Sequence, residues 1–308
     1  MRVVQRIRQW LVVQLFAAVF FLFIALILRD IFLAITRSVF QLSDLPGIWL
    51  GPKGSLSYGG GGAAYSVWAA LVTITLGYFA YWAYVRLFER RTPVELAGTK
   101  AAKECGAGVF IGIAFIGLIA ILLWLLNAFE VSKGDAEWLL LVAPLASAVT
   151  AAFMEEIAIR GIFFRILESR LGTWLALGLS SVFFGVIHAS NPGASICSCA
   201  AIALSAGLVL GAAFIATRRL WLPIGLHFGG NLAQGTLLGL PVSGQPTPGL
   251  LSSRLQGSKF LTGGEFGLEA SVFVPVLGLV LGVALLRYAT KRDRVQPPLW
   301  FTGRDSSE

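Results

Sequence analysis

About eight apolar stretches, each close to 20 residues long, follow one another along this 308-residue chain. A helix needs about 20 apolar residues to cross the hydrocarbon core of a bilayer, where only helices and closed barrels satisfy their backbone hydrogen bonds. The sequence therefore predicts an all-α, polytopic membrane protein. The candidate transmembrane helices cover residues 11–35, 63–85, 106–128, 138–158, 173–190, 196–217, 222–241 and 269–287.

The composition agrees with a chain that meets little water. Hydrophobic residues make up 56% of it, charged residues 13%, and its mean hydropathy is +0.79, whereas soluble domains carry about 25% charged residues. These values exclude disordered, collagen-like and disulfide-stapled secreted chains. Cys105, Cys197 and Cys199 include no C-x-x-C pair, so we expect them to be small apolar residues on membrane helices and no thiolate zinc site.

The positive charges set the predicted orientation. An even number of spans places both termini on one side, and 18 of the 24 Lys and Arg residues then lie on that side. The positive-inside rule makes this side cytoplasmic. We expect a multi-pass protein of the cell inner membrane whose first stretch is retained as a signal anchor. The net charge of +8 is not gathered into a binding stripe, so membrane lipid, and no nucleic acid, is the expected partner.

Two segments rich in Gly, Ser and Pro, residues 41–62 and 243–264, separate some of these stretches. We expect both to be external loops. The first ends in the glycine run Gly59–Gly62. A phosphate-binding role is not favoured for this run, because no Lys-Ser/Thr follows it and no strand pattern lies beside it.

Ionisable residues inside membrane helices are costly, so they mark candidate functional positions. One group is Glu155-Glu156 followed by Arg160, at the end of the fourth stretch. The other two groups hold both histidines of the chain. These groups are Phe184-x-x-x-His188 and His227-x-x-x-Asn231.

Helical geometry predicts what these residues can do. Glu156 and Arg160 are four residues apart, so they share a helix face and can form an ion pair. Glu155 points about 100° away and is free to face elsewhere. His227 and Asn231 also share a face and offer two hydrogen-bond donors to one point.

A turn near Leu171-Gly172 would bring Glu155 and His188 to the same level of an antiparallel helix pair. The segment Ser190–Gly193 after His188 then lines a cavity as irregular backbone. A Glu and a His can together activate water, and a His–Asn pair can stabilise an oxyanion, which are the needs of amide hydrolysis without a covalent intermediate. Taken singly, each motif could instead be a structural ion pair or a helix-packing hydrogen bond.

The three motifs, in this order on separate helices, resemble the CAAX prenyl protease family of intramembrane proteases, also called CPBP or type II CAAX endopeptidase-like proteins, and in particular its bacterial members. The resemblance covers residues 140–240 directly. The upstream segment Glu89–Leu96 is similar to the linker that precedes the family core.

The resemblance implies an intramembrane, glutamate-type endopeptidase with about eight transmembrane helices around a catalytic cavity that opens to the cytoplasm. Glu155 and His188 would activate the attacking water, and His227 and Asn231 would form the oxyanion hole. The residues that would support the site are Glu156, Arg160 and Phe184. The implied parts are N-terminal transmembrane helices and linker (1–137), a CPBP-like catalytic core (138–241), and an external loop, last transmembrane helix and cytoplasmic tail (242–308).

The family reaction is thought to need no cofactor. Two histidines and two glutamates could still bind zinc, so a metalloprotease stays open although it is not favoured. The substrate is a peptide or protein that the sequence does not identify. Two other functions stay open. One is a non-enzymatic bacteriocin-immunity or chaperone-like membrane protein of the same fold, and the other is a proton-coupled transporter with Glu155 and His188 as a relay.

Overall fold

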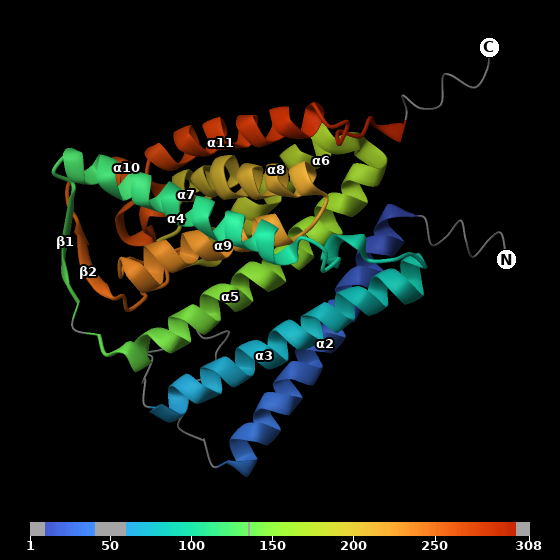
Figure 1. The fold of residues 1–308 in the computed structure, drawn as a ribbon, viewed down its shortest axis with the longest axis horizontal. Coiled ribbons are helices and arrows are strands. Elements are labelled where there is room, and N and C mark those ends of the chain that lie inside the picture. Colours follow the sequence, from blue (N-terminus) through green and yellow to red (C-terminus); the bar gives the residue numbers. More distant parts are fainter. Residues whose placement is uncertain (1–9, 41–59, 135, 300–308) are drawn as a thin grey trace.

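The computed structural model describes residues 10–40, 60–134 and 136–299, which form a bundle of helices (Figure 1). The α-helices are α2 (Leu11–Val39), α3 (Gly60–Ala83), α4 (Ala101–Leu125), α5 (Val142–Glu156), α6 (Arg165–Ile187), α7 (Ile196–Ile202), α8 (Leu208–Thr217), α9 (Trp221–Asn231), α10 (Lys259–Thr262) and α11 (Phe273–Thr290). Wider π-helical turns extend several of them, namely η1 (Tyr84–Glu89), η4 (Ile157–Phe164), η6 (Ala203–Gly207) and η7 (Leu232–Leu237). Tighter 3₁₀ turns are η2 (Val94–Leu96), η3 (Trp138–Leu141), η5 (His188–Ser190), η8 (Gly264–Phe266) and η9 (Leu268–Ala270).

The all-α polytopic membrane fold predicted from the sequence is confirmed. Six helical stretches among the described residues are long and apolar enough to cross a membrane, and the longest runs over 53 residues, Trp138–Ser190. The predicted number of eight is not confirmed. α9 is not one of the six, because α9 and η7 together, from Trp221 to Leu237, are shorter than the shortest of them, which has 18 residues.

The longest stretch contains the predicted turn. Gly172 leaves the helical conformation, with φ 74° and ψ 169°, which only glycine adopts readily. The backbone of the C-terminal tail packs against this bend, where Thr173 N–H donates to the Gln296 carbonyl at 2.9 Å and Gln296 N–H donates to Thr173 Oγ1 at 2.7 Å. The long stretch therefore has two arms joined at Gly172. The first consists of α5, η4 and the start of α6, and the second is the rest of α6.

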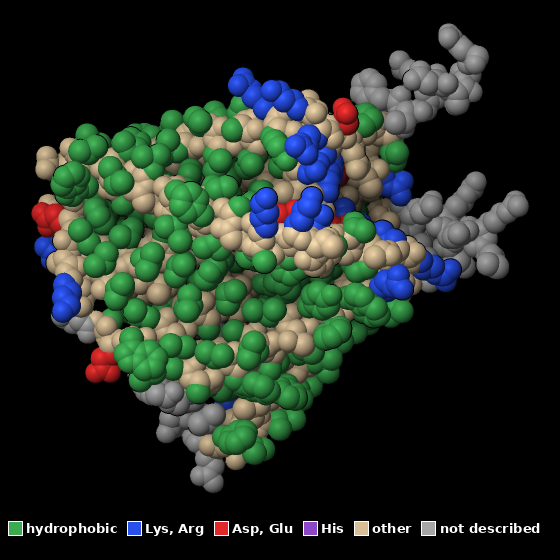
Figure 2. Space-filling model, viewed as in Figure 1, with side chains coloured by type: hydrophobic (Ala, Val, Ile, Leu, Met, Phe, Trp, Pro, Cys, Tyr) green, Lys and Arg blue, Asp and Glu red, His purple; other side chains and the backbone are tan. Residues whose placement is uncertain are grey.

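Hydrophobic and basic side chains occupy different parts of the molecular surface. Hydrophobic side chains cover most of the face seen in Figure 2, and most Lys and Arg side chains of that face gather where the two ends of the chain emerge. Large apolar side chains such as Phe16, Phe110 and Val280 are at least 66% exposed. Such a surface matches lipid around the middle of the bundle and water at its charged end.

The opposite end of the bundle carries a short antiparallel sheet that the sequence did not reveal (Figure 1). β1 (Phe129–Lys133) pairs with β2 (Leu251–Leu255), and Val131 lies opposite Ser253. The expected loop at 243–264 is therefore partly wrong, since it contains β2 and α10. The other expected loop, 41–62, lies outside the described residues up to position 59, and α3 already begins at Gly60 within the glycine run.

The closest helix contact joins α4 to α9 through glycines on both helices. A Cβ added at Gly108 would overlap the carbonyl oxygen of Leu222, and one added at Gly225 would overlap the carbonyl oxygen of Cys105. Small residues let membrane helices approach at backbone distance and gain van der Waals contact. This contact fixes the position of α9, which carries His227 and Asn231.

Widening this contact should destabilise the protein. We expect Gly108→Val to lower the free energy of unfolding in detergent by about 2 kcal/mol or more, because the new side chain meets backbone that cannot move aside. Gly117→Val on the same helix is the matched control, since a Cβ there meets nothing within 4 Å. Equal thermal unfolding of both variants would contradict the packing role of Gly108.

Candidate active site

A buried ion pair lies at the centre of the candidate site. Arg160 Nη1 lies 2.7 Å from Glu156 Oε1, and both side chains are almost fully buried, at 1% and 0% exposed. Arg160 Nη2 also donates to the carbonyls of Ala206 and Gly207, at 3.1 Å each. These carbonyls belong to the widened turn η6. The predicted pair is confirmed, and it joins the end of α5 to η6.

His227 of α9 lies between the two adjacent glutamates of α5. Its Nδ1 is 3.0 Å from Glu156 Oε1, and its Nε2 is 3.9 Å from Glu155 Oε2. Since a carboxylate can only accept, Nδ1 carries the hydrogen in the first contact. The second distance is longer than a hydrogen bond. Glu155 Oε2 is buried without a hydrogen-bond partner among the described residues.

Phe184 brings the two histidines together. Its ring lies edge-on to His188 with centroids 4.9 Å apart, and edge-on to His227 at 6.1 Å. The Arg160 guanidinium lies over the same ring, 4.5 Å from its centroid. Phe184, which is only 2% exposed, therefore packs against both histidines and the buried arginine.

His188 begins the 3₁₀ turn that ends α6. Its Nδ1 lies 2.6 Å from the carbonyl oxygen of Phe184, one helical turn earlier. A carbonyl only accepts, so Nδ1 holds the hydrogen and Nε2 keeps a free lone pair. This tautomer leaves Nε2 able to accept a proton.

Most of the predicted catalytic side chains line one cavity. It has a volume of about 90 Å³, and His188, His227 and Asn231 line it among mainly apolar residues of α4, α6, α8 and α11. A bound water needs about 10–15 Å³ on a comparable scale, so the cavity has room for several waters or part of a peptide. His227 and Asn231, one helical turn apart, therefore line the same cavity.

Glu155 does not line this cavity, and no contact between Glu155 and His188 is recorded within the described ranges. Glu155 lies near the end of α5, and its carboxylate points towards His227 of α9. The side chain is 26% exposed, whereas that of Glu156 is fully buried. Of the two neighbours in sequence, Glu155 is thus the glutamate that keeps access to solvent.

Two polar residues of the cavity wall, Ser243 and Glu269, were missed by the sequence reasoning. Glu269 Oε2 accepts hydrogen bonds from the backbone N–H of Ser243 at 2.8 Å and from its hydroxyl at 2.7 Å. Neither residue has a partner at helical spacing. The available signal in the sequence is that Glu269 is an acidic residue at the first position of the predicted span 269–287.

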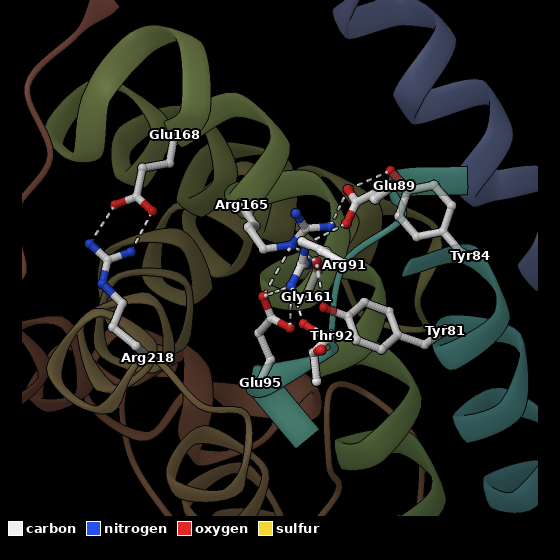
Figure 3. A network of polar contacts seen from close by, with 10 residues as sticks. All are labelled: Tyr81, Tyr84, Glu89, Arg91, Thr92, Glu95, Gly161, Arg165, Glu168 and Arg218. Atoms are coloured by element: carbon white, nitrogen blue, oxygen red, sulfur yellow. Dashed lines mark hydrogen bonds and ion pairs between the residues drawn. The ribbon is translucent and has the colours of Figure 1, made fainter. Parts of the chain in front are cut away.

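A second group of buried charges supports the site from the charged end of the bundle (Figure 3). Arg165 donates from Nη2 to Glu89 at 2.7 Å and from Nε to the carbonyl of Gly161 at 2.8 Å. Arg91 pairs with Glu89 at 2.7 Å and with Glu95 at 2.9 Å. The network fixes the linker before α4 to η4, the turn that directly follows the two glutamates of α5.

No group of three or more His, Cys, Asp or Glu side chains is arranged to hold a metal ion in the part of the chain that the structure describes. Glu156 is already engaged by Arg160 and His227. The metal dependence of the reaction is left to experiment.

The family model for type II CAAX prenyl endopeptidase Rce1-like proteins matches residues 137–233. The chain carries an Rce1-like domain. Its limits include every residue predicted to act in or support the site, from Glu155 to Asn231. At the level of the family, this match supports a CAAX-type membrane-embedded protease, which is a hydrolase. A comparison with curated proteins and with solved structures found no match.

Breaking the central ion pair should be costly. We expect Arg160→Met to lower the free energy of unfolding by about 3–5 kcal/mol, because it leaves Glu156 charged and buried without its partner. The double variant Glu156→Gln/Arg160→Met should be more stable than the single one, since Gln carries no charge and can still accept from His227. Unfolding in detergent measures both.

Glu265→Gln is the control for this experiment. It removes an ion pair with Lys259 in which both side chains are 81% exposed, so we expect a change below about 1 kcal/mol. A double variant as unstable as Arg160→Met would contradict the charge-based explanation.

Proposed function

We propose that this chain hydrolyses a peptide bond within the membrane through water activated by Glu155 and His188, with His227 and Asn231 as the oxyanion hole. The observation that carries the proposal is that His188, His227 and Asn231 line one cavity, while the Glu155 carboxylate lies 3.9 Å from His227. The substrate class is an apolar peptide or a membrane-anchored protein segment.

The activation step uses the free lone pair on His188 Nε2. Phe184 holds the opposite ring nitrogen by its carbonyl, which fixes the ring in this tautomer. Water bound between His188 and Glu155 gives up a proton to this pair as its oxygen attacks the scissile carbonyl carbon. Glu155 can take part because its side chain is 26% exposed and its Oε2 has no hydrogen-bond partner among the described residues.

The oxyanion is stabilised from α9. The carboxylates of Glu155 and Glu156 favour a protonated His227, whose Nε2–H then points away from the bond that Nδ1 makes to Glu156. Asn231, one helical turn further, adds an amide N–H from the same cavity wall. When the tetrahedral intermediate collapses, the C–N bond breaks and the proton held by Glu155 and His188 passes to the leaving amine.

No cofactor is part of this proposal. Arg160 acts only by holding Glu156, and Phe184 only by packing the two histidines. We propose that residues 138–241 are the catalytic core, that residues 1–137 and 242–308 complete the bundle around it, and that the protein lies in the cell inner membrane.

Glu155→Gln and His188→Ala should each lower the cleavage rate of an apolar peptide reporter at least about 100-fold in detergent or liposomes, because each removes part of the base. Glu137→Gln, an exposed glutamate just before η3, should keep the rate of the wild type. Addition of EDTA should also leave the wild-type rate unchanged.

Full activity in either site variant would contradict this mechanism. Loss of activity in EDTA that zinc restores would replace it with a metal-dependent one. A wild-type protein that binds the reporter without cleaving it would favour the non-enzymatic alternative.

We propose that both termini are cytoplasmic, because the basic end of the bundle is the one that the positive-inside rule places there. The cavity is lined by Ser243 and Glu269, which precede α11, and also by mid-helix residues such as Gly112 of α4 and Leu281 of α11, so it extends into the middle of the bundle.

Thiol labelling tests the orientation. In a background without the three native cysteines, Lys259→Cys should react with a membrane-impermeant maleimide in intact cells, because this side chain is 81% exposed at the extracytoplasmic end. Lys291→Cys, which directly follows α11 at the basic end, should react only after the cells are opened. The reverse pattern would overturn the proposed orientation.

A further inference from the structure

Glu269 is an acidic residue of the cavity wall that lies outside the segment matched by the Rce1-like family. It belongs to η9, between two fully buried residues, Leu268 and Ser271. These neighbours fix its backbone against the bundle. The side chain is partly exposed and lines the same cavity as His188 and His227.

A chain of hydrogen bonds connects the Glu269 carboxylate with the turn that carries His188. Ser243, held at a positive φ of 47°, directs both its backbone N–H and its hydroxyl to Glu269 Oε2. Asn191 Nδ2 donates to the carbonyl of Ser243 at 3.0 Å. Since Asn191 directly follows η5, this chain of hydrogen bonds connects Glu269 with the segment that begins at His188.

The electrostatic surroundings of Glu269 are unusual. Burial raises the pKa of its carboxyl above the ordinary value, while the hydrogen bonds from Ser243 and the closeness of His188 and His227 act in the opposite direction. Neither Lys nor Arg forms an ion pair with Glu269 in the described part of the chain. The positive charge that this carboxylate can stabilise is therefore that of a protonated histidine of the cavity.

A nearby glutamate shows the contrast. Glu265, four residues earlier, is 81% exposed and lies 3.5 Å from the equally exposed Lys259. Exposed pairs of this kind contribute little and need no functional explanation. A carboxylate that is enclosed without a cation destabilises the folded protein. Such groups are found at functional sites, where their charge acts on a neighbouring group.

We propose that Glu269 is a positioning residue of the active site, whose carboxylate holds the His188 turn through Ser243 and stabilises the imidazolium that forms when His188 takes the proton of the attacking water. This inference rests on the proposed function. His227 has two carboxylate neighbours on α5, Glu156 at 3.0 Å and Glu155 at 3.9 Å. Glu269 of η9 lines the same cavity as both histidines.

The test measures kcat and KM for cleavage of the apolar reporter peptide by the full-length protein. Glu269→Gln keeps the hydrogen-bond acceptor for Ser243 but removes the charge. We expect its kcat to fall roughly 10- to 100-fold with KM changed less than about twofold, because the charge acts on the transition state and not on substrate binding. Glu269→Asp should recover part of the lost kcat.

Glu265→Gln is the matched control and should behave as the wild type, since this residue faces solvent in the same segment. Ser243→Ala removes only the hydroxyl contact and should give an intermediate loss of kcat at unchanged thermal stability. It also provides a second measurement if Glu269→Gln fails to fold.

The outcomes separate the two proposals. An inactive wild type, or a His188→Ala variant that keeps activity, overturns the proposed function and this inference with it. An active wild type with an inactive His188→Ala and unchanged kcat in Glu269→Gln overturns the role of Glu269 alone. A Glu269→Gln variant that loses activity only as it loses thermal stability also overturns it, because the residue would then be structural.

Discussion

The ion pair between Glu156 and Arg160 is the interaction on which the site depends. Both groups are removed from water. The free-energy cost of desolvating two charges is offset only when their geometry is good and additional hydrogen bonds are made. Here two carbonyls of η6, the ring of Phe184 and the imidazole of His227 supply those contacts. One buried ion pair thereby connects four elements, α5, α6, η6 and α9, beside the cavity that His188 and His227 line.

Widened helical turns recur around this pair. η4 follows Glu156, η6 presents its carbonyls to Arg160, and η7 begins directly after Asn231. π-helical turns are rare and occur frequently at functional sites, because they displace backbone groups from the regular hydrogen-bond ladder. In this bundle they release carbonyls for a buried cation and alter the direction of helices beside the cavity.

The sequence was sufficient for what depends on local spacing. The apolar stretches, the ion pair four residues apart, the bend at Gly172 and the shared face of His227 and Asn231 all follow from helical periodicity. The sheet of β1 with β2 and the approach of Glu269 to the cavity depend on segments far apart in the chain. Such contacts leave no period in the sequence, so they were missed. The sequence also does not predict the direction of the Glu155 side chain, because histidines on two different helices are possible neighbours.

The bend at Gly172 has a consequence for how the protein is made. The backbone of Gln296 and Pro298 fills the space beside this glycine, so the bend is closed by a tail that follows α11. The ribosome delivers the two arms with Glu156 and His188 to the membrane well before that tail exists. The bend between α5 and the second half of α6 can therefore be closed only after α11 and the tail have been synthesised.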